Sequence, residues 1–143
     1  MKIRDVMTRD VIRIDPEESV SVAARTLTHY NIGALPVCGG DGKLCGMLTD
    51  RDIVTRCLAA ELSPERTAVS QIMTAQVHTV RPDMDAGAAA MLMGRQQVRR
   101  LPVVEQGKLR GMVSLGDLAS HRESTSAAAG ALKDISSSLS VRD

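Results

Sequence analysis

Aromatic side chains are almost absent from this sequence of 143 residues, which contains one Tyr and neither Phe nor Trp. Proteins that bind single-stranded nucleic acid by base stacking need aromatic platforms, so that class is excluded. An excess of one charge is missing as well, because 18 basic residues stand against 17 acidic ones. A near-neutral chain carries no broad electrostatic footprint for nucleic acid. The composition therefore predicts a protein without a nucleic-acid partner.

Long apolar runs are also missing. The first ten residues, MKIRDVMTRD, mix both charge signs and do not resemble a signal peptide. No later segment approaches the roughly 18 apolar residues of a membrane-spanning helix. Apolar residues nevertheless make up 43% of the chain, enough to form a buried core. We therefore expect a soluble cytoplasmic protein with no membrane partner, folded as one compact domain or two very small ones.

Cysteine is scarce, with Cys38, Cys45 and Cys57 as the three examples. An odd number without an export signal favours reduced thiols, buried as small hydrophobic side chains. One alternative is redox-sensitive: if Asp41-Gly42 forms a two-residue hairpin turn, Cys38 lies directly opposite Cys45, where a disulfide is geometrically feasible. No His or carboxylate shares a ligand spacing with these cysteines, so no metal site is predicted.

An internal duplication dominates the sequence. VMT at 6–8 returns as IMT at 72–74, and LPV at 35–37 returns at 101–103, each shifted by 66 residues. After one deletion in the hairpin the shift becomes 65. Between the copies, AELSPERTA has the Pro and charge content of a linker. We divide the chain into repeat 1 (1–62), repeat 2 (63–122) and a Ser/Ala-rich tail (123–143).

Both repeats predict the element order β-α-β-β-α. Short β-rich runs at 11–14 and 77–80 precede helical patterns that begin behind Ser19 and Asp85, two suitable N-cap residues. A two-stranded hairpin and a closing helix follow in each copy. Because a unit of this size cannot bury its sheet alone, we expect one α/β (α+β) domain with pseudo-two-fold symmetry.

The tail has its large aliphatic residues at Leu132, Ile135 and Leu139. This spacing favours a docked helix that begins near Ser126 and is interrupted by Gly130. A loose tail is the alternative, because the segment is rich in Ser and Ala.

Each repeat places a hydroxyl residue and an aspartate where its second hairpin strand meets the closing helix. The first corner, residues 49–52, reads TDRD, and the second corner, residues 114–117, reads SLGD. Such a pattern is typical of a capping box, in which hydroxyl and carboxylate satisfy backbone N–H groups reciprocally. It is also suited to a nucleotide, because a helix N-terminus with a hydroxyl favours phosphate and a carboxylate can accept from a ribose diol.

The order of these motifs, VMT/IMT, LPV and G-M-x-T/S-x-x-D, resembles a tandem pair of CBS domains, also called a Bateman module. The resemblance covers about 120 of the 143 residues, and TDRDIV is similar to small bacterial members of the hypoxic-response type. It implies a non-catalytic regulatory module that binds AMP, ADP, ATP or S-adenosylmethionine in two clefts between the repeats. It also implies a homodimer and a regulated partner protein that the sequence does not identify.

In that family, each corner works with strands of the opposite repeat. The resemblance therefore implies a first cleft made of Thr49, Arg51, Asp52, Thr74, Val98, Arg99 and Arg100. It implies a second cleft made of Ser114, Asp117, Thr8, Ile32, Gly33 and Ala34.

The predicted clefts differ in charge. Arg51, Arg99 and Arg100 match phosphate oxygens, so the first cleft is the expected phosphate site. Strand alternation, however, can send either Arg99 or Arg100 out to solvent. A ligand-free assembly module, with the corners serving only as helix caps, is the alternative function. No set of nucleophile, base and orienting residue and no P-loop is present, so we predict no enzyme and no catalytic residues.

Overall fold

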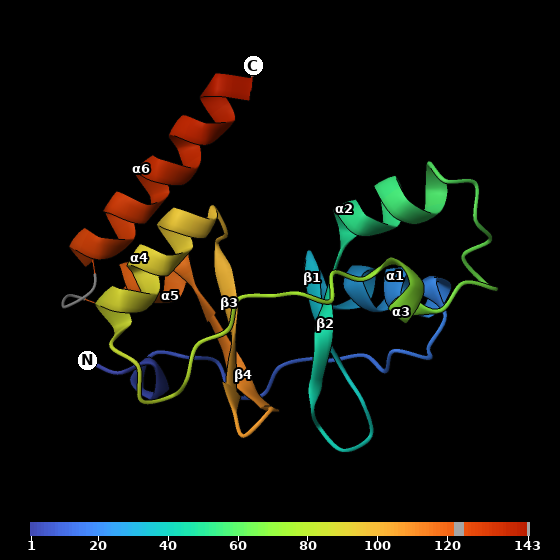
Figure 1. Ribbon diagram of the computed structural model, residues 1–143, viewed down its shortest axis with the longest axis horizontal. Helices are drawn as coiled ribbons and strands as arrows, with labels where there is room; N and C mark the ends of the chain where they lie inside the picture. Colours follow the sequence, from blue (N-terminus) through green and yellow to red (C-terminus); the bar gives the residue numbers. More distant parts are fainter. Residues whose placement is uncertain (122–124, 143) are drawn as a thin grey trace. The chain divides into compact units, whose positions relative to one another are not determined.

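The computed structural model describes residues 1–121 and 125–142, with side chains described through residue 136 (Figure 1). Its chain forms two compact units that do not coincide with the sequence repeats. Unit 1 contains Met1–Val11, His78–Gln106 and Arg110–Asp143, and unit 2 contains Ile12–Val77 and Gly107–Leu109. The N-terminal segment thus belongs to the unit formed by repeat 2. Mixed helix and strand content confirms the predicted fold class.

Unit 2 is built around the hairpin of β1 (Ala34–Cys38) and β2 (Leu44–Thr49), which are antiparallel. Its helical segments are α1 (Val20–Tyr30), α2 (Asp50–Asp52), the π-helical η2 (Ile53–Leu58) and α3 (Val69–Ile72). Helix α1 begins where expected, because Ser19 Oγ accepts from the Val22 N–H at 3.2 Å. One isolated bridge extends the sheet on each side: Ile14 pairs with Val37 in parallel, and Thr74 pairs with Met47 in antiparallel. The predicted strand at 11–14 is therefore reduced to a single bridging residue.

Apolar side chains from β1, β2, α1, η2 and α3 of unit 2 meet in one core. Cys57 is part of this core, and Cys38 is buried as well, as expected for small hydrophobic side chains. The core consists of Ile14, Val20, Ala23, Leu27, Leu35, Val37, Leu48, Cys57, Val69 and Ile72. Burying each large member stabilises the fold by about 1.5–3 kcal/mol relative to exposure.

The hairpin register differs from the prediction. A four-residue turn closes the hairpin, with the Gly42 N–H donating to the Gly39 carbonyl at 3.0 Å. A bulge after Val37 then pairs Cys38 with Leu44, so the predicted opposition of Cys38 and Cys45 is wrong. The turn has four residues rather than two, so two residues that were expected in the strands lie in the turn instead. All three cysteines are free thiols.

Unit 1 repeats the same plan with β3 (Arg100–Glu105) and most of β4 (Lys108–Ser114). Its helices are η1 (Ile3–Asp5), α4 (Ala86–Gln96), α5 (Leu115–Ala119) and α6 (Thr125–Arg142). Val80 bridges Val103 in parallel, and Thr8 bridges Met112 in antiparallel, as Ile14 and Thr74 do in unit 2. The antiparallel bridge of each unit is therefore made by a residue of the other repeat: Thr74 of repeat 2 in unit 2, and Thr8 of repeat 1 in unit 1.

Glycines in β2 and β4 make these outer pairings possible. A Cβ atom at Gly46 would overlap the carbonyl of Thr74, and a Cβ atom at Gly111 would overlap the carbonyl of Thr8. Thr74 meanwhile exchanges two backbone hydrogen bonds of 2.9 Å with Met47. The G-M dipeptide of the repeat is thus explained by close backbone approach.

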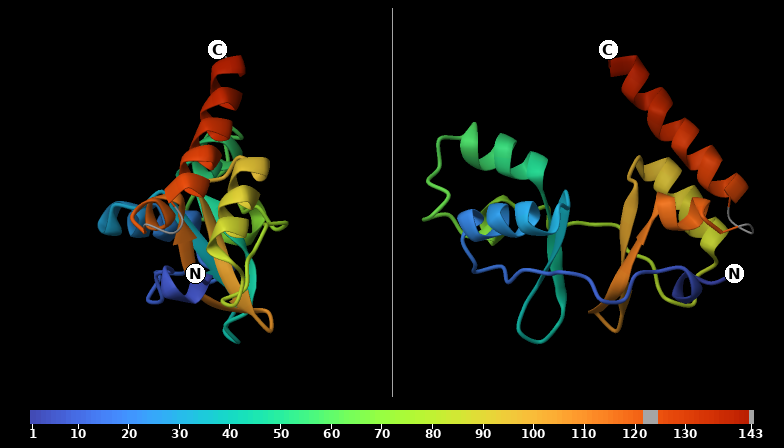
Figure 2. Two further views of the ribbon diagram at one scale, coloured as in Figure 1. Left: turned by 90° about the vertical axis from the view of Figure 1, so that its left-hand side faces the viewer. Right: turned by 180° about the vertical axis from the view of Figure 1, so that it is seen from behind.

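Helix α6 packs against α4 and α5 within unit 1 (Figure 2). It begins one residue before the expected Ser126 and continues through Gly130 without interruption. The buried side chains are Ala128, Ala131 and Ile135, whereas Leu132 is 44% exposed, contrary to the predicted spacing. Small residues face α4 because a Cβ at Gly94 would lie 3.2 Å from the Ala131 Cα. The Leu139 side chain lies outside those described. Neither α6 nor any other described helix is long and apolar enough to cross a membrane.

Candidate ligand-binding site

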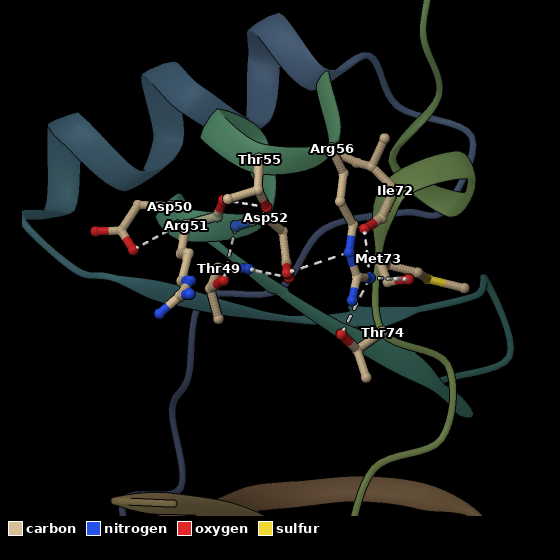
Figure 3. Close-up of polar contacts among 9 residues, drawn as sticks. All are labelled: Thr49, Asp50, Arg51, Asp52, Thr55, Arg56, Ile72, Met73 and Thr74. Carbon is tan, nitrogen blue, oxygen red and sulfur yellow. Dashed lines mark hydrogen bonds and ion pairs between the residues drawn. The ribbon is translucent and has the colours of Figure 1, made fainter. Parts of the chain in front are cut away.

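The first corner is a complete capping box (Figure 3). The Thr49 N–H donates to Asp52 Oδ2 at 3.0 Å, and the Asp52 N–H donates to Thr49 Oγ1 at 3.0 Å. Asp52 is one of two buried polar residues among those described, with 9% of its surface exposed. The strand ends here because Thr49 is extended while the next residues are helical. The capping interpretation of the sequence is therefore right.

The second corner has the same geometry in unit 1. The Ser114 N–H donates to Asp117 Oδ2 at 2.8 Å, and the Asp117 N–H donates to Ser114 Oγ at 3.0 Å. Leu115 and Leu118 are buried beside it and fix the short helix α5 on the sheet. Two matching corners at the matching place in each unit confirm the duplication in three dimensions.

The capping hydrogen bonds do not use every polar atom of the two corners. Each carboxylate spends Oδ2 on the cap, and each hydroxyl accepts one bond while keeping its own proton as a donor. Asp117 Oδ1 has no partner in the described part of the chain, and Asp52 Oδ1 lies 3.9 Å from Arg56 Nε. Capping and ligand binding are therefore compatible, because they use different atoms.

Arg56 contacts the first corner from the following helical turn, and the sequence interpretation missed it. Its Nη1 donates to the carbonyls of Ile72 at 3.2 Å and Met73 at 3.3 Å, and to Thr74 Oγ1 at 3.4 Å. Figure 3 shows Arg56 and Arg51 on opposite sides of Thr49. The position of Arg56, four residues after Asp52 on a helix, was the available signal, since i,i+4 pairs of opposite charge face each other.

The two threonines of the VMT/IMT motifs lie near different corners. Thr74 pairs with Met47, two residues before Thr49, and Thr8 pairs with Met112, two residues before Ser114. Thr74 therefore lies in the same unit as Thr49, and Thr8 lies in the same unit as Ser114.

Two backbone hydrogen bonds place the segments that enter β1 and β3 within their units. The Gly33 carbonyl accepts from the Asp50 N–H at 3.0 Å, so Ile32, Gly33 and Ala34 lie at the first corner. The Arg99 carbonyl accepts from the Leu115 N–H at 2.7 Å, so the 98–100 segment lies at the second corner. Hairpin pairing explains this placement, because the residue that opens β1 faces the residue that ends β2. Within each unit, the corner therefore meets the strand entry of its own repeat.

This placement changes the charge comparison. At the first corner, the Asp50 carboxylate accepts from the Arg51 N–H at 2.8 Å, so a side chain of the protein already occupies that amide. The Asp50 and Asp52 N–H groups are also bonded within the protein. At the second corner, Leu115 replaces Asp50, so no acidic side chain caps the next amide. Arg99 and Arg100, assigned to the first cleft from the sequence, are exposed residues of the second corner's unit.

Thiol and metal chemistry contribute little to either corner. Burial raises the pKa of the Cys38 thiol, which lowers its thiolate fraction at neutral pH. Across residues 1–121 and 125–136, no three His, Cys, Asp or Glu side chains converge in a way that could hold a metal ion.

Comparison with known proteins identifies the class. The CBS domain family model matches residues 3–59 and again 69–124. The chain belongs to the CBS domain family and carries a tandem pair, which is a regulatory module. The resemblance stated from the motifs is therefore confirmed.

Its relatives include two bacterial proteins of similar size. CBS domain-containing protein YhcV of Bacillus subtilis is 40% identical over 94% of both chains. Hypoxic response protein 1 of Mycobacterium tuberculosis is 40% identical over 82% of both chains.

Solved structures agree. The crystal structure of Hypoxic Response Protein I with two coordinated zinc ions has a TM-score of 0.78 and 36% identity, covering 85% of this chain and 98% of that one. The CBS domain pair of protein MJ0100, in complex with 5′-methylthioadenosine and S-adenosyl-L-methionine, has a TM-score of 0.73 and 27% identity, covering 84% and 94%.

Proposed function

We propose that this CBS pair is a non-catalytic cytoplasmic regulator that binds an adenosine-containing ligand at its two corners. The observation that carries the proposal is the second oxygen of each corner carboxylate, which capping does not use. A carboxylate oxygen fixed by backbone on its other side is a preorganised acceptor for a ribose hydroxyl. The duplicated geometry supports two binding positions for one ligand class.

The proposed ligands are AMP, ADP, ATP and S-adenosylmethionine, which share adenosine and differ in the group on the 5′ carbon. MJ0100, a structural relative, is known in complex with two adenosyl compounds. The proposed contact residues lie in two groups that follow the units. They are Thr49, Arg51, Asp52, Thr74, Ile32, Gly33 and Ala34 at the first corner, and Ser114, Asp117, Thr8, Val98, Arg99 and Arg100 at the second.

Isothermal titration with the four ligands tests the proposal in wild type, Asp52→Asn and Asp117→Asn. Asparagine keeps one acceptor oxygen for the cap but loses the charge, so folding is preserved better than with alanine. We expect each variant to lose binding at its own corner. Asp85→Asn is the matched control, because Asp85 caps α4 at the Ala88 N–H and takes part in neither corner.

Failure of the wild type to bind any of the four ligands would reject the sensor and favour the ligand-free assembly module. Equal losses in the Asp85 control would assign the effects to helix capping alone.

We also propose a homodimer, because unit 2 exposes several large apolar side chains on its helices and the loop after them. They are Tyr30, Val54, Leu58 and Leu62. Val54 is 54% exposed and Leu58, four residues later on the same helical segment, is 70% exposed; neighbouring exposed apolar side chains of this kind are typical of a surface that a partner covers. Light scattering should show a dimer that Leu58→Glu converts to monomer, while Leu132→Glu on α6 leaves it intact. A monomeric wild type would overturn this assembly.

A further inference from the structure

We propose that Arg56 is the positioning residue of the first corner: it orients the Asp52 carboxylate and the Thr74 hydroxyl for a bound adenosine. This inference rests on the proposed function and assigns a role to a side chain outside the predicted contact set. All three residues belong to unit 2.

The Arg56 side chain connects the helix of the first corner with the segment at residues 72–74. Nη1 is bonded to two consecutive carbonyls and to Thr74 Oγ1, while Nε of the same planar group faces Asp52 Oδ1 at 3.9 Å. A guanidinium holds several acceptors in a fixed fork, which a flexible ammonium group does not. The helix that begins at Asp50 is thereby tied to the 72–74 segment.

This arrangement prepares two ligand-facing atoms. Thr49 fixes Asp52 Oδ2, and the Arg56 guanidinium lies beside Oδ1, so both oxygens of the carboxylate are held in this orientation. Because Thr74 Oγ1 accepts from Arg56, its own proton remains available as a donor. The Asp52 side chain is 13% exposed and that of Arg56 is 50% exposed, so a ligand can approach without displacing the core.

The second corner differs at the position equivalent to Arg56. A shift of 65 residues from Arg56 leads to His121, which lies two residues beyond α5 and has its Nδ1 2.8 Å from the Asp117 carbonyl. We therefore assign the positioning role to the first corner, and the second corner provides an internal reference for it.

Titrations of adenosine and AMP in an Asp117→Asn background isolate the first corner. We expect Arg56→Gln to weaken both ligands by the same factor, about tenfold, the order expected for loss of one charge-assisted contact at a half-exposed site. Arg56→Lys should recover part of the affinity. Arg25→Gln, an exposed arginine on α1, serves as the matched control and should change nothing.

The possible outcomes distinguish a failure of the positioning role of Arg56 from a failure of the proposed ligand binding. Loss of AMP affinity with adenosine unchanged would make Arg56 a phosphate contact and overturn the positioning role. Unchanged binding of both ligands in Arg56→Gln would also overturn it, while the proposed function stands. An Asp117→Asn protein that binds neither ligand, although wild type binds, would place the site at the second corner alone. No binding by wild type would reject both proposals.

Arg56→Gln must also be separated from a general loss of stability. Its binding to the second corner, measured in an Asp52→Asn background, should equal that of the parent. An equal loss at both corners would identify Arg56 as a purely structural residue and reject the inference.

Discussion

The two corners have the same capping box but different surroundings. The first has an acid at the start of the helix and Arg56 bridging to the next segment; the second has Leu115 and Gly116 there, with Arg99 and Arg100 in the same unit. Capping depends on backbone geometry, which the duplication preserved. The residues around each capping box, in contrast, set the local charge of that corner. The difference shows that one fold feature can remain constant for stability while the charged surroundings of its two copies diverge.

The largest expected effect tests the feature that the units share. Gly46→Ala and Gly111→Ala each place a methyl group against a carbonyl of the outer bridge, and should cost about 2–3 kcal/mol of unfolding free energy. Urea denaturation measures both. Gly40→Ala, where no atom lies within 4 Å, is the control and should be nearly neutral. A harmless Gly46→Ala would contradict the close approach to Thr74.

Helix α6 belongs to unit 1, where it packs on α4. Gly94→Val should disrupt this packing and lower the free energy of unfolding by about 1–3 kcal/mol. Hydrogen exchange should increase in α6 and α4, with unit 2 unchanged. Gly130→Ala in the same helix has open space and should stabilise it by up to about 1 kcal/mol. Unchanged protection of α6 in Gly94→Val would show that the helix does not depend on this contact.

The caps should prove equivalent. Thr49→Ala and Ser114→Ala each remove one hydroxyl acceptor and should lower stability by about 1 kcal/mol. Thermal unfolding compares the two, with Thr28→Ala as an exposed threonine of α1 for control. A markedly larger loss for one corner would indicate that the boxes are not energetically alike.

The smallest expected effect concerns the thiols, all of which lie in unit 2. Half-buried Cys45 should react with a thiol reagent before Cys38 and Cys57, which are buried. The raised pKa of Cys38 lowers the fraction of its thiol that is ionised at neutral pH. Labelling of Cys38 should therefore begin only at more alkaline pH. Mass spectrometry after mild oxidation should show no loss of two hydrogens. A Cys38–Cys45 disulfide would contradict the observed register.

Features carried by local spacing could be predicted from the sequence. The duplication, the Ser19 and Asp85 caps and both capping boxes follow from residue type and interval, and the structure has them all. The burial of Cys38 and Cys57 followed from their apolar character.

Features that depend on register or on close packing could not be predicted. One bulge after Val37 moved Cys45 away from Cys38, and no local pattern signalled it. The tail helix buries Ala131 rather than Leu132, because the partner surface at Gly94 admits only small side chains. The pairing of the Arg99 carbonyl with the Leu115 N–H within unit 1 could not be predicted either, because a motif order does not state which strand entry a corner meets.

The pairing of Thr8 with Met112 has a consequence for synthesis on the ribosome. Unit 2 obtains its outer bridge as soon as residue 74 has emerged, but the first eleven residues find their partner strand only when β4 is made. At ~5–20 residues per second, the roughly 100 residues between Thr8 and Met112 take about 5–20 s to be made, and during this time the first eleven residues have no sheet to join. During that interval a nascent chain can offer this segment to the β4 strand of a neighbouring copy.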